Sequence, residues 1–186
     1  FATTTSGFLI RPYQTVSGQP NSLKWTEEQL LGIHGENTAD LSGATDGLYA
    51  RDTVLNFNNA APADVGNFNS SNGYTDEQFP GLPGITLLTG SSAVEVMAYL
   101  EFPEPGVYQL GVNSDDGFRL SAGRTPNDLA GSILGYFDGG RGSSDSIFSV
   151  AVEEAGIYPI RLIWENGRGE SGNGANLEFF SVTGKQ

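Results

Sequence analysis

Short runs of alternating apolar and polar residues, separated by turns, limit most strongly how this chain can fold. About nine such runs occur at intervals of about ten residues, and Gly or Pro stands in most connections. Side chains two residues apart in a strand share a face, as Ile160, Leu162 and Trp164 would with Tyr158. Short, regularly spaced strands with turn signals are typical of sandwiches and barrels. We therefore predict an all-β fold, an antiparallel β-sandwich or barrel with long loops.

One short helix and one long loop interrupt this pattern. The helix is predicted to begin at Thr26, because Thr26 and Gln29 have the spacing of a capping box and Glu27 and Glu28 would lie in the first turn. Residues 58–84 are rich in Asn, Gly, Pro and Ser and predict a long ordered loop. The predicted strands cover residues 6–15, 48–57, 93–102, 107–113, 118–121, 132–138, 146–152, 157–165 and 175–182.

Charge and composition narrow the classes of partner. Lysine and arginine number 9 against 22 aspartates and glutamates, a net charge of -13 that disfavours nucleic acid and anionic membrane surfaces. Such a surplus of carboxylates suits cations, calcium above all, although solubility alone would also explain most of it. The absence of cysteine excludes thiolate metal sites and cysteine nucleophiles. No linker or repeat separates a second unit, so residues 1–186 are expected to form a single domain.

Asp115 and Asp116 lie in a turn within the segment Gly106–Gly123, which reads GVYQLGVNSDDGFRLSAG. One interpretation is a β-hairpin, because Asp-Gly between alternating runs is a strong hairpin signal. That interpretation explains only Asp116. Adjacent carboxylates repel each other unless a cation lies between them, and in extended chain they point to opposite sides. A shared metal ion would require an unusual backbone, such as a cis peptide bond.

Two glycine-rich loops are further candidates. The loop 165–176 contains G-x-G-x-x-G, but a predicted strand follows it instead of a helix, so no dinucleotide site is expected there. It is either a flexible loop or one whose carbonyls and Asn166 amide turn toward a cation. Residues 139–145 resemble one imperfect calcium-binding nonapeptide, and a plain hairpin loop is the favoured interpretation. His34 is the only histidine, which disfavours a transition-metal site.

Three segments together resemble a PA14 domain, a β-sandwich module found in glycosidases, yeast flocculins, epithelial adhesins and bacterial RTX-type adhesins. They are FPGLPG (79–84), AYLEFPEPGVYQLGVNSDDGFRL (98–120) and AGIYPIRLIWENGRG (155–169). The ordered combination of G-x-Y-x-x-x-V-x-S-D-D-G with A-G-x-Y-P-I-R-L carries the resemblance, which is good from residue 79 onward and looser before it. The disulfides of the yeast members are absent, which favours a bacterial module.

The lectin branch of this family binds calcium through two adjacent aspartates joined by a cis peptide bond, an asparagine side chain and two backbone carbonyls. The ion then coordinates vicinal hydroxyls of a sugar. Carried over by position, the resemblance implies calcium as cofactor with these ligands: Asp115, Asp116, Asn166, Arg168 and Glu170. It implies a sugar site made of Asp115, Asp116, Arg168, Glu170, Ser171 and Asn173.

The leading hypothesis is therefore a calcium-dependent carbohydrate-binding (lectin) module without enzymatic activity. It would be a monomeric domain of a larger extracellular or cell-surface protein, a bacterial adhesin, and its partners would be glycans with vicinal hydroxyls. Two alternatives remain open. One is a structural PA14 module without sugar binding inside a larger enzyme or toxin. The other is a small glycoside hydrolase, which needs only two suitably separated carboxylates.

Overall fold

The computed structural model describes residues 6–16, 18, 20–82, 91–167 and 175–182. Six strands form one sheet: β1 (Phe8–Thr15), β2 (Tyr49–Arg51), β4 (Ser91–Phe102), β6 (Phe118–Ala122), β7 (Ser132–Phe137) and β9 (Gly156–Asn166). Four strands form the other: β3 (Leu55–Asn58), β5 (Gly106–Asp115), β8 (Ser144–Val152) and β10 (Asn176–Ser181). The helical elements are α1 (Leu23–Leu30) and the short 3-10 helix η1 (Ser70–Asn72).

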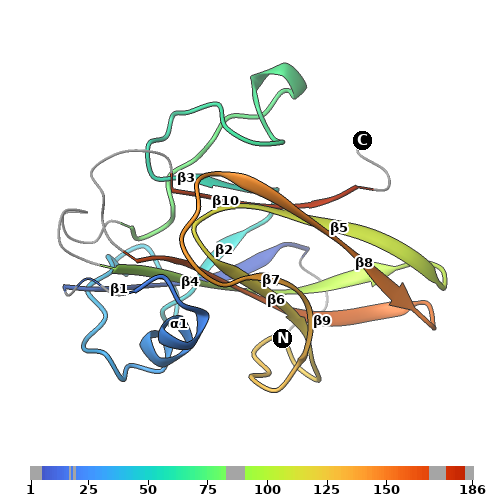
Figure 1. The fold of residues 1–186 in the computed structure, drawn as a ribbon, viewed down its shortest axis with the longest axis horizontal. Helices are drawn as coiled ribbons and strands as arrows, with labels where there is room; N and C mark the ends of the chain where they lie inside the picture. The colour runs from blue at the N-terminus through green and yellow to red at the C-terminus, as the bar shows by residue number, and fades with distance from the viewer. Residues whose placement is uncertain (1–5, 17, 19, 83–90, 168–174, 183–186) are drawn as a thin grey trace.

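The two sheets lie face to face and form a β-sandwich (Figure 1). The strand orders are β2-β1-β4-β9-β6-β7 and β3-β10-β5-β8, and the pairs within both sheets are antiparallel. The all-β prediction is confirmed, and the structure selects the sandwich over the barrel. In the described part of the chain, no helix is both long and apolar enough to cross a membrane.

The core lies between the sheets. Trp164 and Leu162 of β9 and Phe118 of β6 face Leu177 of β10 and Val112 of β5, and all five are at most 1% exposed. Each such side chain contributes roughly 1.5 to 3 kcal/mol by leaving water. The predicted shared face of β9 is confirmed for its buried members, and Tyr158 packs at the rim against Phe102.

The predicted strand 48–57 is wrong as a single element. It consists of β2 and β3, which belong to different sheets. Between them Asp52 and Thr53 are exposed, and burying these polar groups in a continuous strand would cost free energy. Leu55 and Phe57 then enter the core from the second sheet. The chain therefore changes sheet here, although its residue pattern is that of one strand.

The predicted start of the helix is also wrong. The N-cap is Ser22, and Thr26 lies inside α1, where its Oγ1 donates to the carbonyl of Ser22 at 2.9 Å. Gln29 is fully buried, and its side chain donates to the carbonyls of Tyr13 and Ser91. Docking onto the sheet thus sets the boundaries of this two-turn helix, because so short a helix has little stability of its own.

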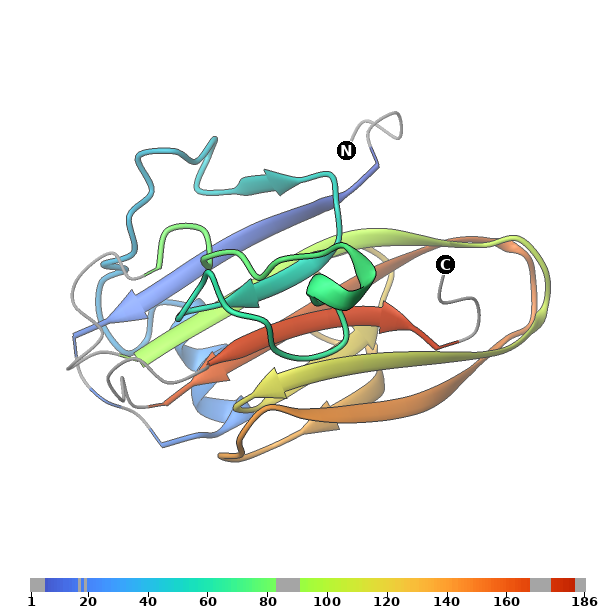
Figure 2. The same cartoon turned by 90° about the horizontal axis from the view of Figure 1, so that it is seen from above.

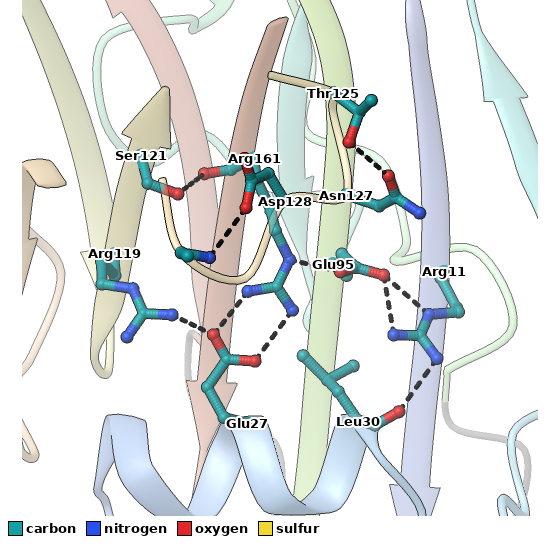
Figure 3. Close-up of polar contacts among 11 residues, drawn as sticks. Arg11, Glu27, Leu30, Glu95, Arg119, Ser121, Thr125, Asn127, Asp128 and Arg161 are labelled. Atoms are coloured by element: carbon teal, nitrogen blue, oxygen red, sulfur yellow. Dashed lines mark hydrogen bonds and ion pairs between the residues drawn. The ribbon is translucent and has the colours of Figure 1, made fainter. Parts of the chain in front are cut away.

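Helix α1 covers the outer face of the six-stranded sheet through an ion-pair network (Figure 3). Glu27 of α1 pairs with Arg119 of β6 and with Arg161 of β9, whose Nη2 lies 2.9 Å from Glu27 Oε2. Glu95 of β4 pairs with the same Arg161 and with Arg11 of β1, at 2.7 Å for the latter. Arg11 also donates to the carbonyl of Leu30 at the end of α1. Helix α1 and four strands are thereby joined on one face.

The loop between β3 and β4 covers the outer face of the four-stranded sheet, over β3 and β10 (Figure 2). Glu178 of β10 accepts hydrogen bonds from the backbone N–H groups of Asn67 and Phe68 at 2.8 and 3.1 Å. Asp76 accepts one from Asn58 Nδ2 at 3.1 Å. The described part of the predicted long loop is therefore held to the sheet by polar contacts.

Candidate functional site

The Asp115–Asp116 pair lies at the end of β5, where the chain leaves the four-stranded sheet and enters β6 of the other sheet. The hairpin interpretation of this turn is wrong, because β5 and β6 do not pair with each other. Both aspartates are partly exposed, and the peptide bond between them is cis. The indole Nε1 of Trp164 donates to the carbonyl oxygen of Asp115 at 3.0 Å, so the core directly supports the turn.

The turn is joined to the end of β9. The backbone N–H of Asp116 donates to the carbonyl of Glu165 at 3.3 Å, and the N–H of Glu165 donates to the carbonyl of Gly117 at 3.0 Å. Asn166, the next residue along β9, is half-buried and stands at the same end of the sandwich. The structure thus brings Asp115, Asp116 and Asn166 together. The other predicted site residues, Arg168, Glu170, Ser171 and Asn173, lie outside the described residues.

A third segment, residues 138–143 between β7 and β8, also reaches the pair. The backbone N–H of Arg141 donates to Asp116 Oδ1 at 2.8 Å. The hairpin interpretation of residues 139–145 is wrong, since β7 and β8 belong to different sheets and this connection, like the one at Asp115, crosses between them. At both places the sequence has a short polar, glycine-containing segment between alternating runs, which is also the pattern of a hairpin.

Glu165 is a functional candidate that the sequence did not indicate. Its side chain is fully buried, and neither carboxylate oxygen has a hydrogen-bond partner of good geometry. Burial, followed by the nearby charge of Asp116, raises the pKa of Glu165 to about 8, and Asp138 adds to the rise, while the Gly117 amide partly opposes it. At neutral pH this carboxyl is therefore protonated and adds no charge beside the aspartate pair.

Gly117 is required by this packing. A Cβ at position 117 would lie 2.6 Å from Glu165 Oε1 and 3.0 Å from the carbonyl oxygen of Phe137. The first distance is shorter than any ordinary Cβ contact and the second is tight, so a side chain here would force its neighbours to shift, and the glycine lets the turn approach β7 and β9 closely. The Asp-Asp-Gly sequence thus combines two partly exposed acids with one residue whose lack of a side chain permits the close packing.

The oxygen donors at this end of the sandwich suit a hard cation. Carboxylate and amide oxygens are calcium ligands, whereas structural zinc sites use sulfur and imidazole. Among the described residues, no three acidic, histidine or cysteine side chains are close enough to hold a metal ion by themselves. An ion bound to Asp115 and Asp116 would therefore need the amide oxygen of Asn166 and further oxygens from carbonyls, water or a ligand. The residues present fit calcium on chemical grounds.

Neither the family models nor the curated proteins include a match to this sequence. Solved structures do match it. The PA14 domain of an antifreeze protein superposes with a TM-score of 0.60 at 16% identity, over 98% of this chain and 85% of that one. The PA14 sugar-binding domain of an RTX adhesin gives a TM-score of 0.55 at 14% identity, over 97% and 93% of the two chains. This protein has the PA14 fold.

The same fold occurs in proteins of different activity. A variant A domain of epithelial adhesin 9 from Candida glabrata, solved with β-lactose, gives a TM-score of 0.53 at 11% identity over 95% of this chain and 79% of that one. A β-glucosidase from Kluyveromyces marxianus gives 0.53 at 11% identity over all of this chain but only 18% of its own. Identities this low establish the fold, so function rests on the site itself.

Proposed function

We propose that this PA14-fold protein is a calcium-dependent carbohydrate-binding module of a secreted or cell-surface adhesin. The observation that carries the proposal is the convergence of Asp115, Asp116 and Asn166 at one end of the sandwich, through the backbone bonds between the Asp-Asp-Gly turn and β9. The aspartates are accessible to a ligand, and the glycine-rich segment that begins at Gly167 follows directly.

Calcium would connect this site to a sugar. Calcium accepts six to eight oxygen ligands in irregular geometry, so two vicinal hydroxyls of a sugar can replace two waters without rebuilding the site. The protein would supply the two carboxylates and the Asn166 amide oxygen. Carbonyls of the following segment, Arg168 and Glu170 by the resemblance, would complete the set, and Ser171 and Asn173 would contact the sugar.

Two structural neighbours support the class of ligand. One is described as a sugar-binding domain of an RTX adhesin, and another was solved in complex with β-lactose. Affinity for one sugar should be weak, because the hydroxyls replace water contacts of similar quality. Useful adhesion would then come from many copies on one surface.

A calcium and sugar titration tests the proposal. The protein should bind calcium, and glycan-array binding should require it and vanish in EDTA. Asp116→Asn keeps the size of the side chain and should weaken calcium binding at least about 100-fold, since it removes a charged ligand from the ion. Asp128→Asn is the matched control: Asp128 also accepts backbone N–H bonds, but in the loop after β6, and should bind as the parent does. Binding that survives both EDTA and Asp116→Asn would contradict the mechanism.

The competing function is a structural module within a larger enzyme, which the match to one part of a β-glucosidase favours. In that case the aspartates would only shape the turn. The same titration separates the two: a structural module would bind neither calcium nor any glycan, and Asp116→Asn would change only its thermal stability.

A further inference from the structure

Arg141 places its side chain inside the end of the sandwich, under the aspartate pair. Its Nε donates to the carbonyl of Ser114 at 3.1 Å, and its Nη2 donates to Ser114 Oγ at 2.7 Å. Its Nη1 donates to Ser146 Oγ of β8 at 2.9 Å. Ser114 immediately precedes the pair, and its own Oγ donates to the carbonyl of Asp116 at 2.7 Å. One guanidinium therefore links β5, β8 and the turn.

The same guanidinium also packs on aromatic rings of the other sheet. Its central carbon lies 4.4 Å from the ring centre of Phe137 in β7 and 5.6 Å from that of Phe118 in β6. Cation–π contacts of this kind attract the guanidinium to the faces of the two rings. Because these three hydrogen bonds come from three nitrogens held in one rigid plane, a lysine, which has a single side-chain nitrogen, cannot reproduce them.

The segment before Arg141 directs its backbone N–H at Asp116. Gly139 has φ +133°, which side-chain-bearing residues rarely adopt, and a Cβ at Gly140 would lie 2.6 Å from Asn21 Nδ2 and 3.5 Å from Asp116 Oδ1. Asp138 anchors the start of the segment by accepting the N–H of Leu23 at 2.8 Å. The segment Asp-Gly-Gly-Arg is therefore held at both ends, by Asp138 and by Arg141. The backbone N–H of Arg141 donates to one oxygen of Asp116, a carboxylate that our proposal assigns to calcium.

We infer that Arg141 is a positioning residue for the calcium site: it fixes the turn and the Asp116 carboxylate before the ion arrives. The inference rests on the proposed function. Its side chain holds Ser114 and the segment 138–143 in place, and its backbone N–H holds Asp116 Oδ1, which orients the other oxygen of that carboxylate. Groups that orient metal ligands in this way typically contribute 10- to 100-fold in metal affinity.

Isothermal titration of the purified protein with calcium tests this role. Arg141→Ala should weaken calcium binding about 10- to 100-fold. Arg141→Lys keeps the backbone N–H and the positive charge, and should fall near Arg141→Ala, because the planar set of donors is lost. Ser146→Ala removes one contact of the guanidinium and should give a smaller loss. Gly139→Ala leaves the arginine intact but puts a side chain on a residue with φ +133°, which disturbs the segment that directs the Arg141 N–H at Asp116, and should weaken binding as well.

A destabilised control separates positioning from general loss of stability. Val152→Ala removes buried methyl groups at the opposite end of the sandwich and should lower the melting temperature while calcium affinity stays at the parent value. Equal affinity in the parent, Arg141→Lys and Ser146→Ala would overturn the inference and leave the proposed function intact. Tighter binding in Arg141→Ala would also overturn it, since the guanidinium would then act by repelling the ion. A parent that binds no calcium would overturn both.

Discussion

The two outer faces of the sandwich bury acidic side chains in opposite ways. Under α1, Glu27 and Glu95 are each paired with two arginines (Figure 3). Under the loop between β3 and β4, Glu178 and Asp76 are held by backbone N–H groups and asparagine amides, and their described contacts include no ion pair. One face neutralises its buried carboxylates with charge, and the other only with dipoles.

The pKa values differ accordingly. Burial alone would lower the pKa of Arg161, but the hydrogen bonds that it donates to Glu27 and the charges of Glu95 and Glu27 raise that pKa, so the guanidinium stays charged. Burial raises the pKa of Glu178, the amides of Asn67 and Phe68 partly oppose that rise, and Asp76 adds to it. Glu178, buried without a cation, therefore makes the loop-covered face sensitive to pH, whereas the helix-covered face depends on its arginines.

The largest expected effect comes from removing the shared arginine of the helix-covered face. Arg161→Met should lower the free energy of unfolding by about 3 kcal/mol, because it removes the buried arginine shared by Glu27 and Glu95 and leaves each carboxylate with only one of its two cationic partners. Arg119→Met, at a more exposed position with one partner, is the control and should cost less. Denaturant unfolding measures the stability of both variants. Equal losses of unfolding free energy would show that the deeper burial and the second partner of Arg161 do not matter.

A smaller, local effect is expected on the loop-covered face. Glu178→Ala removes the acceptor for two backbone N–H groups and should cost about 1 to 3 kcal/mol. The amides of Asn67 and Phe68 should then exchange with deuterium much faster, while those of α1 keep their rates. Unchanged exchange at these two amides would mean that Glu178 does not anchor the loop.

The smallest expected effect is a change in how the unfolding free energy depends on pH, and it again concerns the loop-covered face. A carboxyl whose pKa is raised in the folded state loses stabilisation as pH increases from its ordinary value of 4.5 through the raised one. Glu178→Gln should therefore make the decline of unfolding free energy above about pH 4.5 shallower than in the parent. Glu165, with a pKa of about 8, contributes a decline of the same sign and should keep the slope from vanishing. A slope as steep as the parent's would contradict the assignment to Glu178.

The fold class could be predicted because alternation of apolar and polar residues shows which face of a strand is buried. Ile160, Leu162 and Trp164 are buried, as their spacing indicates. It failed where the chain changes sheets. A crossing between sheets and a hairpin have the same local pattern, two alternating runs around a polar glycine turn, and only long-range pairing separates them. The turn at Asp115 and the segment 138–143 are both of this kind.

The candidate site was predictable only in part for the same reason. The adjacent carboxylates of Asp115 and Asp116 are unusual enough to be noticed in a sequence, and so is an asparagine that ends a strong strand. Arg141 and Glu165 have no comparable local signal, because their contacts with the Ser114–Gly117 segment join residues 25 to 49 positions apart in the chain. Residue type alone does not show that an arginine lies between two aromatic rings or that a glutamate is fully buried.

The hydrogen bond from Trp164 to the carbonyl of Asp115 has a spectroscopic consequence. The indole is 1% exposed and stacks on Phe79 with ring centres 4.4 Å apart, so its emission is that of a water-excluded fluorophore. Any ion or ligand that moves Asp115 changes the electric field along that N–H bond. The only other tryptophan, Trp25 of α1, stacks on His34, and a Trp25→Phe background would leave a single tryptophan, which is in direct contact with the site.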